Sequence, residues 1–358
     1  MLAVNTVAAA LATPQVARGD DQAAVVTPMP CAARAIQAGN LPITWHAGPV
    51  DDRESLDQWC RAVGPPVVIA APEASDGALP PALEELVVLT WNAHLAEGDL
   101  RGLIENLRAG ELTGGRPVQH FVLLLQELYR RGPDVPAFGP DTRSAFAILP
   151  RDPRASDVRD HAHALGLSTL YVPSMRNGEG MLEDRGNAII STEPLVDAFA
   201  LELPFERQRR VVVGAAIQVR ASGSLRRLHV VDTHLEPLSS PASLWIFRNP
   251  RRRQVAAILE LLQSSHFEND GQAVGTVLGG DFNTIQGGMD EDAYLRARAW
   301  SQSLVSEDRR PTHHMGRIDY LFFRLAPDWI AASTRVEEKF GSDHHPVVGR
   351  FFSRSRTP

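Results

Sequence analysis

The sequence predicts an α+β protein in which packed β-sheets are flanked by helices. Ten short runs of apolar, often β-branched residues are separated by turn signals, a pattern typical of buried strands. Helical spacing of apolar residues occurs in only four segments, and strands and helices do not alternate strictly. Strict alternation would favour a parallel α/β sheet, so this order favours packed sheets with helices outside them. The chain has 358 residues, 44% of them hydrophobic, which is enough for a large core.

The first 82 residues are predicted to form an N-terminal extension. Residues 1–45 are rich in small residues and proline. A short helix is expected over 51–63, because Leu56, Trp59 and Val63 fall on one face. An apolar run at 67–72 is consistent with a strand, and residues 73–85 have the composition of a linker. We therefore expect the main domain at 83–353 and a short tail at 354–358.

The main domain contains the ten predicted strands and three of the predicted helices. The strands are expected at 87–91, 121–126, 145–149, 167–172, 187–192, 210–219, 225–233, 273–280, 317–324 and 347–352. The helices are expected at 99–109, 157–165 and 252–263.

The net charge and the hydropathy of the chain exclude few classes of binding partner. No apolar stretch reaches the roughly 18 residues expected of a membrane span. The formal charge of −7 provides no global basic field for nucleic acid. A cation-binding pocket is itself rich in acids, however, so a local nucleic-acid groove stays compatible with this charge. We expect a monomer, because no segment points to a particular interface.

The two cysteines, Cys31 and Cys60, both precede the main domain. They fit a single disulfide in an oxidising compartment, or two unrelated buried thiols. Neither has a second ligand at zinc-site spacing, so a zinc site is not expected. The apolar N-terminus lacks the basic region of a secretory signal, although residues 10–12 resemble a cleavage site. We expect a secreted or periplasmic protein, with a cytoplasmic one as the alternative.

Five apolar runs adjoin residues that can bind a metal or transfer a proton. Strands that end at one edge of a sheet can bring such residues into one pocket, although they are far apart in sequence. Four runs precede the polar residue and the last follows it; the residues are Asn92, Glu127, His234, Asp281 with Asn283, and Asp343 with His344.

The oxygen-bearing residues of this set suit a hard cation. Glu127 follows an apolar strand, where a carboxylate is costly unless it is paired or bound to a cation. Asp281 and Asn283 are two residues apart, so an extended segment places both on one face. Together with Asn92 they favour Mg²⁺ or Mn²⁺. The alternative is that Asn and Asp serve here as ordinary turn residues.

Two histidines are candidates for proton transfer. His234 follows an apolar strand, and His344 is preceded by Asp343. A carboxylate beside a histidine can fix its tautomer and raise its pKa. Asp319, on another apolar strand, is a candidate to orient such a histidine. The pair His313–His314 is predicted to be a polar surface turn.

The main domain carries seven short motifs in a fixed order: WN at 91–92, QE at 126–127, GNAIIS at 186–191, THL at 233–235, GGDFN at 279–283, RIDYLF at 317–322 and SDHHPV at 342–347. In this order, over residues 84–353, they strongly resemble the endonuclease/exonuclease/phosphatase superfamily. That group includes pancreatic deoxyribonuclease, abasic-site endonucleases, neutral sphingomyelinases and inositol polyphosphate 5-phosphatases. The resemblance implies a four-layer α/β/β/α sandwich of two mixed sheets and a divalent-metal phosphoesterase.

The resemblance also implies a role for each residue. The metal ligands would be Asn92, Glu127 and Asp343, with Glu127 the principal one. His234 would bind the phosphate, while Asp281 would orient or deprotonate water with Asn283 beside it. His344 would act on the scissile phosphate with support from Asp319. Because members differ in their base, Asp281 and His344 are assigned jointly. The implied cofactor is Mg²⁺, with Mn²⁺ as an alternative.

One departure from the family pattern concerns a positive charge. Thr192 stands where the family segment has arginine, and Arg185, Arg209 and Arg210 are candidates to replace it. The residues expected to contact substrate are Arg130, Arg185, Asn187 and Arg210. The segment 238–250 mixes apolar and basic residues, which fits either a lipid or nucleic-acid contact or a helix-start staple.

Three functions are compatible with this sequence. The first is a nuclease that cleaves DNA, with RNA as a further substrate. The second is a phosphodiesterase or phosphatase for a phospholipid or a small phosphorylated compound. The third is a non-enzymatic scaffold, against which the intact metal and histidine set counts.

Overall fold

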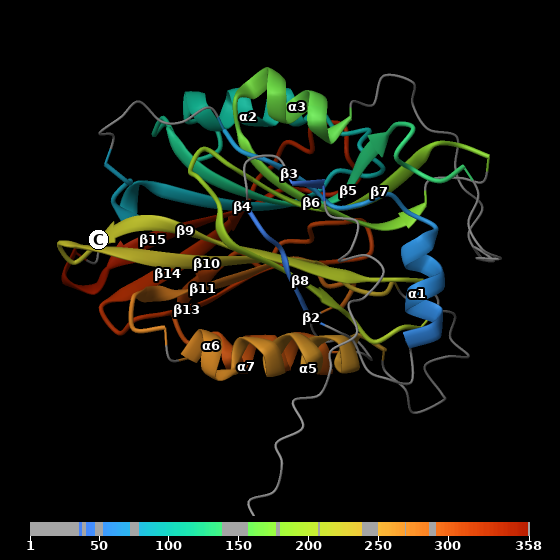
Figure 1. Ribbon diagram of the computed structural model, residues 1–358. Helices are drawn as coiled ribbons and strands as arrows, with labels where there is room; N and C mark the ends of the chain where they lie inside the picture. The colour runs from blue at the N-terminus through green and yellow to red at the C-terminus, as the bar shows by residue number, and fades with distance from the viewer. Residues whose placement is uncertain are drawn as a thin grey trace, which may run out of the picture.

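The computed structural model describes residues 36–37, 41–46, 53–71, 79–137, 157–176, 180–206, 208–237, 250–268, 270–285 and 291–356. Two mixed β-sheets pack face to face between two layers of helices (Figure 1). The predicted four-layer α/β/β/α sandwich is therefore confirmed. Among the described residues, no helix combines the length and apolar character that crossing a membrane requires.

The first sheet contains nine strands within the described residues, in the order β1–β3–β6–β7–β5–β4–β15–β14–β12. Strands β4 and β5 are parallel, whereas β15 and β7 run antiparallel to them. The strand bounds are β1 (Ile36–Gln37), β3 (Val67–Ile69), β4 (Leu86–Asn92), β5 (His120–Arg131), β6 (Ser168–Arg176), β7 (Glu183–Ser191), β12 (Leu304–Glu307), β14 (Trp329–Arg335) and β15 (Val347–Ser353).

The second sheet contains six strands within the described residues, in the order β13–β11–β10–β9–β8–β2. Its central strands β10 and β11 are parallel, and β9 and β13 flank them in the antiparallel direction. The strand bounds are β2 (Thr44–His46), β8 (Val196–Glu202), β9 (Val211–Ala221), β10 (Ser224–His234), β11 (Ala273–Asp281) and β13 (Asp319–Leu325).

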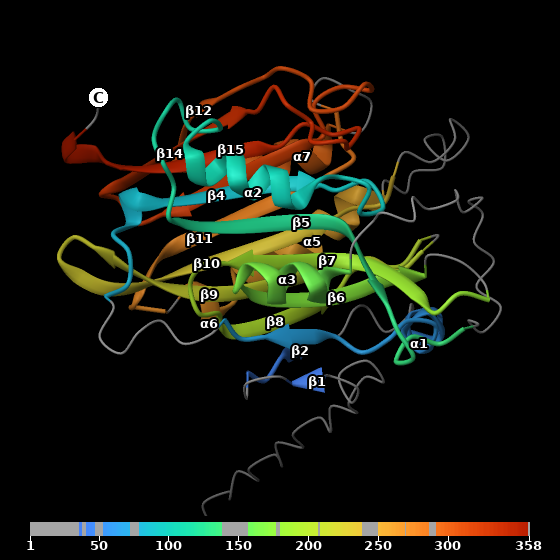
Figure 2. The same cartoon turned by 90° about the horizontal axis from the view of Figure 1, so that it is seen from above.

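Helices cover the outer faces of both sheets. Figure 1 shows α2 and α3 above the first sheet and α5, α6 and α7 below the second, and Figure 2 shows α2 and α3 lying over β4 to β7. The helices are α1 (Arg53–Arg61), α2 (Leu100–Ala109), α3 (Val158–Leu165), α5 (Pro250–Leu262), α6 (Ser265–Glu268) and α7 (Asp292–Trp300), with short 3₁₀ turns η3 (Leu83–Glu85) and η4 (Arg354–Arg356).

The continuous apolar run in β5 is explained by burial of both faces of the first sheet. Val122 and Leu124 point into the core between the two sheets. Leu123 and Leu125 belong to a second core that includes residues of α2 and α3. Because side chains alternate along a strand, each face of β5 needs its own apolar set. Full burial of one such side chain contributes about 1.5–3 kcal/mol, so these cores fix the sandwich.

The predicted helices are confirmed, with caps that the sequence supplies. Asp99 accepts a hydrogen bond from the Gly102 amide at 2.8 Å, and Gly110 ends α2 in the left-handed conformation with φ 89°. Asp157 caps α3 in the same way through the Arg159 amide, also at 2.8 Å. Helix α5 begins at Pro250, two residues before its predicted start.

Some elements were not predicted, and one predicted strand lies outside the described residues. Strands β8, β12 and β14 and helices α6 and α7 carry weak patterns. In α7 two of the four buried positions are alanines, Ala293 and Ala297, which hardly register as apolar in a sequence. The predicted strand at 145–149 and the segment 238–249 are outside the described residues.

The structure corrects the predicted domain boundary. Strand β3 pairs antiparallel with β6, and β2 pairs parallel with β8, so residues before 82 extend both sheets. The predicted helix at 51–63 forms α1, and Leu56, Trp59 and Cys60 are buried. Cys60 is disulfide-bonded, while Cys31 and the predicted signal remnant lie outside the described residues. Residues 53–71 therefore belong to the sandwich.

A buried ion pair joins this N-terminal segment to the sandwich. Arg130 and Asp184 face each other across β5 and β7 and have no exposed side-chain surface. Asp184 also accepts hydrogen bonds from the Gly64 amide and the Tyr171 hydroxyl, each at 2.8 Å. Arg130 in turn donates to the carbonyl of Pro65. The pair is thus held by groups that precede and follow residue 82.

Replacing Asp184 by alanine would leave the buried Arg130 with only the partly exposed Asp134 as a counter-ion, 3.4 Å from Nη1. We expect the free energy of unfolding to fall by about 3–5 kcal/mol. Glu105→Ala is the control, because the Arg101–Glu105 pair is exposed and its loss costs about 0.3–0.5 kcal/mol. Urea denaturation followed by circular dichroism measures both variants, and equal small losses would contradict the structural role of the pair.

Candidate active site

The polar ends of four strands meet a bulge in β5, which continues past its predicted end at residue 126. In the first sheet Asn92 ends β4 and pairs with Gln126 of β5, directly before Glu127. In the second sheet His234 pairs with Asp281, and Asp281 pairs with Asp319 on β13. Gly280 allows the close approach of β11 to β10, because a Cβ there would collide with the Thr233 carbonyl. The structure thus brings together residues from positions 92 to 344.

Asp281 lies at the centre of the group and is buried. Its carboxylate accepts hydrogen bonds from Asn92 Nδ2 at 3.0 Å and from the Asn283 amide at 2.9 Å. The nearest imidazole nitrogens are His234 Nε2 at 3.5 Å and His344 Nε2 at 4.0 Å. Burial, together with the negative charge of Asp319, raises the pKa of Asp281 to about 7. A carboxylate with such a pKa can accept a proton near neutral pH.

His344 and Asp319 form an acid–imidazole pair. His344 Nδ1 lies 2.9 Å from Asp319 Oδ2, and both side chains are buried. Burial acts to lower the pKa of His344, but the charge and hydrogen bond of Asp319 outweigh it and raise the pKa to about 10. The ring is therefore an imidazolium at neutral pH, with Nε2 on the side of Asp281 and Asp343.

His234 has the opposite electrostatic state. Burial, followed by the positive charges of Arg210, His344 and Arg185, lowers the pKa of His234 well below 6.5. Its Nδ1 is buried without a hydrogen-bond partner among the described residues and lies 4.0 Å from Glu127 Oε1. His234 is therefore neutral where His344 is charged.

Glu127 is set by an irregular backbone. It lies at a bulge in β5 with φ 56°, a conformation that L-residues rarely adopt. Its Oε2 accepts a hydrogen bond from the Leu95 amide at 3.1 Å. Leu95 belongs to a turn in which His94, Leu95 and Ala96 all have positive φ. The backbone is thus strained both at Glu127 and at the turn whose Leu95 amide binds its carboxylate, and together they hold this carboxylate in place.

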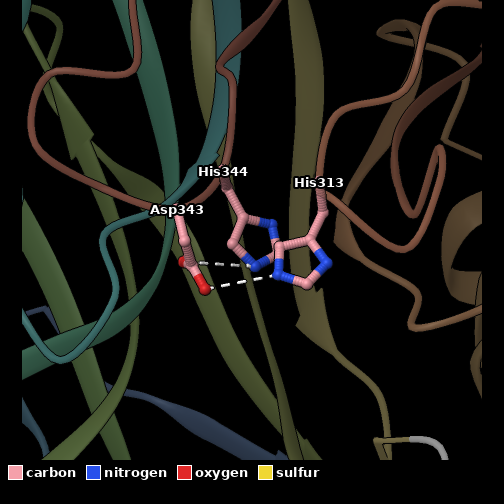
Figure 3. A group of neighbouring side chains, drawn as sticks. All are labelled: His313, Asp343 and His344. Atoms are coloured by element: carbon pink, nitrogen blue, oxygen red, sulfur yellow. Dashed lines mark hydrogen bonds and ion pairs between the residues drawn. The ribbon is translucent and has the colours of Figure 1, made fainter.

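Asp343 lies among three histidines, two of which are drawn with it in Figure 3. Its Oδ2 is 3.3 Å from His313 Nε2, and its Oδ1 is 3.1 Å from His94 Nδ1 and 3.7 Å from His344 Nε2. Burial acts to raise the pKa of Asp343, but the three imidazoles outweigh it and hold the pKa below its ordinary value. Asp343 is therefore an anion at neutral pH.

The prediction that His313–His314 is a surface turn is wrong for His313. His313 is only 6% exposed, and its ring stacks on His344 with centroids 4.6 Å apart. His314 is exposed, as predicted. His94 was also missed, because nothing in its sequence neighbourhood marks it as a ligand or base. Only the fold brings both histidines to Asp343.

The expected arginines divide into two groups. Arg130 was predicted to contact substrate, which is wrong, because it is fully buried against Asp184. Arg209 is likewise buried, and its Nε donates to Glu202 Oε2 at 2.9 Å, so it does not replace the missing family arginine. Each of these arginines forms a buried ion pair with a carboxylate of the fold.

Arg185 and Arg210 lie beside the pocket. Arg185 Nη1 is 4.0 Å from Glu127 Oε2, and Arg210 Nε is 3.8 Å from Glu236. Arg210 is 3% exposed, and its Nε and Nη1 have no hydrogen-bond partner among the described residues. Asn187 donates to the Val211 carbonyl at 3.1 Å, directly after Arg210. Buried guanidinium groups without hydrogen-bond partners are suited to an anionic ligand.

The oxygen donors fit a divalent cation. Asp343 Oδ1 is shielded from solvent, and its closest imidazole nitrogen among the described residues is His94 Nδ1, at 3.1 Å. Glu127 contributes a second carboxylate, and Asn92 Oδ1 accepts the His94 amide at 3.0 Å. His94 is close enough to Asp343 and Glu127 for both carboxylates to act to raise the pKa of its imidazole. Carboxylate and amide oxygens are typical ligands of Mg²⁺ and Mn²⁺.

Comparison with known proteins gives the family. The sequence model of the endonuclease/exonuclease/phosphatase family matches residues 89–344. The chain belongs to this family. Its members are hydrolases of phosphoester bonds and generally depend on divalent metals. No match was found among curated proteins.

Several solved structures are similar to this chain. An endonuclease/exonuclease/phosphatase from Beutenbergia cavernae has 20% identity and a TM-score of 0.49, covering 75% of this chain and 71% of that one. The human Nocturnin catalytic domain with bound sulfate has 18% identity and a TM-score of 0.47, covering 76% and 94%. Sphingomyelinase C from Streptomyces griseocarneus has 17% identity and a TM-score of 0.44, covering 74% and 98%. At these identities the likeness concerns the fold and carries no argument about substrate.

Replacing Asp319 by asparagine removes the charge that sustains the His344 imidazolium. In the metal-free protein we expect the pKa of His344 to fall from about 10, because burial is then opposed only by the charges of Asp281 and Asp343. NMR titration of the imidazole C2 proton measures this, with Glu105→Gln as the control. An unchanged titration in Asp319→Asn would contradict the pairing.

The same pair makes stability depend on pH. The folded pKa of His344 is raised above the ordinary 6.5, so the stabilisation is complete below pH 6.5 and is lost as pH rises through about 10. Denaturation midpoints measured between pH 6 and 10 should therefore fall more in the wild type than in Asp319→Asn.

Proposed function

We propose that this protein is a Mg²⁺-dependent phosphodiesterase that cleaves DNA by attack of water on phosphorus. The observation that carries the proposal is the electrostatic layout of one pocket. Oxygen atoms that can bind a cation lie beside three groups: the Asp281 carboxyl group, whose pKa is about 7, the His344 imidazolium and the neutral His234 imidazole. Mn²⁺ is the alternative cation.

The cation would be held by Asn92, Glu127 and Asp343. When bound, Mg²⁺ supplies Lewis-acid stabilisation of charge on the phosphate oxygens. The protein contributes the positions of the ligands: the bulge and the Leu95 amide hold Glu127, and the end of β4 holds Asn92. These supports are part of the fold itself, so little reorganisation is needed on binding.

Asp281 is suited to accept the proton of the attacking water. Its pKa near 7 makes proton acceptance favourable at neutral pH, and the hydrogen bonds from Asn92 and Asn283 fix its two oxygens. Asn283 itself is held by the Leu235 carbonyl at 3.1 Å. Because family members differ in their base, Asp281 and His344 are assigned together to proton transfer.

His344 and His234 act on the phosphate in different ways. His344 is an imidazolium whose Nε2 proton can stabilise negative charge or pass to the leaving oxygen, while Asp319 holds Nδ1. His234 is neutral and offers a nitrogen without a hydrogen-bond partner among the described residues. Arg185 and Arg210 supply the positive charge that Thr192 lacks.

A second candidate is a phosphodiesterase or phosphatase for a phospholipid or a small phosphorylated compound. It is favoured by Met181 and Leu182, which are 52% and 43% exposed directly before β7, the strand of Arg185. Exposed apolar side chains near a phosphate site suit a lipid interface. We further propose a monomer in an extracytoplasmic compartment, where the disulfide of Cys60 would persist.

A substrate panel in the presence of Mg²⁺ separates these functions. The substrates are supercoiled plasmid, sphingomyelin vesicles and bis-p-nitrophenyl phosphate. Plasmid nicking without lipid cleavage supports the nuclease, and lipid cleavage without nicking supports the second candidate. No turnover of any substrate, with no Mg²⁺ binding by calorimetry, would leave a non-enzymatic scaffold.

Glu127→Gln and His344→Gln should each reduce kcat on the active substrate by about 10²–10⁴-fold. Glu127→Gln removes a charge from the cation site, and His344→Gln removes the positive donor. His163→Gln is a matched control, since His163 is exposed and lies in α3. Initial rates at saturating Mg²⁺ measure the effect, and rates near wild type in either variant would refute the assignment.

A further inference from the structure

We propose that His313 is a positioning residue that fixes Asp343 by a hydrogen bond and His344 by ring stacking. Figure 3 shows the His313 and His344 rings side by side, with Asp343 reaching a nitrogen of each. The inference rests on the proposed function, because Asp343 is one of the residues assigned to the cation. His313 itself is assigned no contact with cation or phosphate.

The tautomer of His313 follows from its two nitrogen contacts. The Met315 amide donates to Nδ1 at 3.3 Å, so in the neutral ring the proton is on Nε2. Nε2 then donates to Asp343 Oδ2, which lies 3.3 Å away. His313 is thus a donor toward Asp343 rather than a metal ligand.

This hydrogen bond selects which oxygen of Asp343 remains free. Rotation about the terminal bond of an aspartate side chain is soft, so a carboxylate needs a partner to hold one orientation. With Oδ2 engaged by His313, Oδ1 is left shielded from solvent, with His94 Nδ1 3.1 Å away. Oδ1 is the atom whose lone pairs are available to a cation. A partner of this kind typically changes metal affinity by about 10–100-fold.

Ring stacking extends the same support to His344. The two rings are 4.6 Å apart between centroids and inclined by 28°. Asp319 fixes His344 at Nδ1 only, which leaves the ring free to tilt about that hydrogen bond. The neutral ring of His313 covers one face of the His344 imidazolium and restricts this tilt. One side chain therefore contacts both residues of the Asp343–His344 pair.

A tight turn makes His313 rigid and couples it to Asp319. Within the turn, the His313 amide donates to Gly316 at 2.9 Å and the Gly316 amide donates back at 3.0 Å. Thr312 Oγ1 accepts the amides of Ile318 and Asp319, each at 3.1 Å. The turn leads into β13, so its two ends carry the partners of Asp343 and of His344.

The turn is also bound to the loop it orients. The His345 amide donates to the Thr312 carbonyl at 2.7 Å. Residues 342–345 therefore cannot move independently of residues 312–319. The hydrogen bond between His344 and Asp319 and the contact between His313 and Asp343 belong to one unit, although the segments they join are 25 residues apart or more.

Three variants separate the hydrogen bond from the stacking. His313→Gln retains a donor near the position of Nε2 but loses the ring. His313→Phe retains a ring but loses the donor. His163→Gln is the control, because His163 is an exposed histidine in α3. Mn²⁺ dissociation constants from electron paramagnetic resonance give a readout that does not depend on turnover, and thermal unfolding confirms that each variant is folded.

We expect His313→Phe to weaken Mn²⁺ binding by about 10–100-fold, while His313→Gln stays closer to wild type and His163→Gln is unchanged. At saturating Mn²⁺ the order should reverse for kcat, because only phenylalanine preserves the stacking on His344. A purely structural role would not produce opposite orders in affinity and kcat.

Asp343→Asn identifies the source of a negative result. If Asp343→Asn loses Mn²⁺ affinity but His313→Phe binds Mn²⁺ as wild type does, His313 does not position the carboxylate. That result overturns the inference and leaves the proposed ligand set intact. If Asp343→Asn also binds Mn²⁺ as wild type does, Asp343 is not a cation ligand. That result overturns both the inference and the proposed ligand set.

Discussion

The hydrogen bond between Asn92 and Asp281 joins the two sheets at the site, and the rest of the pocket depends on it. Asn92 ends β4 of the first sheet and Asp281 ends β11 of the second. The two residues meet only because the inner faces of both sheets are apolar and pack together. A shift of one sheet along the other would separate the residues assigned to the cation from the acid assigned to the water.

Similar residue types have different states in this pocket because their surroundings differ. His344 is charged because Asp319 is within hydrogen-bonding distance, whereas His234 is neutral because it is buried near positive charges. Asp281 and Asp343 show the same contrast among carboxylates, with pKa shifts of opposite sign. Acid and base roles therefore follow from neighbours rather than from residue type.

Several charges that resemble substrate contacts instead hold the scaffold together. Arg130 and Arg209 are fully buried against Asp184 and Glu202. Through Asp184, the segment before residue 71 is tied to β7, the strand that also carries Arg185. A buried ion pair is stable only when hydrogen bonds also satisfy the remaining polar atoms of both side chains. Gly64, Pro65 and Tyr171 form such hydrogen bonds here. The N-terminal segment thereby supports the edge of the site.

The sequence by itself determined the fold class, the family, the main strands and the residues at their ends. Apolar periodicity and ordered motifs are local properties, so Asn92, Glu127, His234, Asp281 and His344 could be found without a structure. The tertiary structure decided the rest: that residues 53–71 belong to the sandwich, that Arg130 is structural, and that His94 and His313 flank Asp343. These depend on contacts between segments far apart in the chain, and no local pattern encodes which partner a polar side chain will meet.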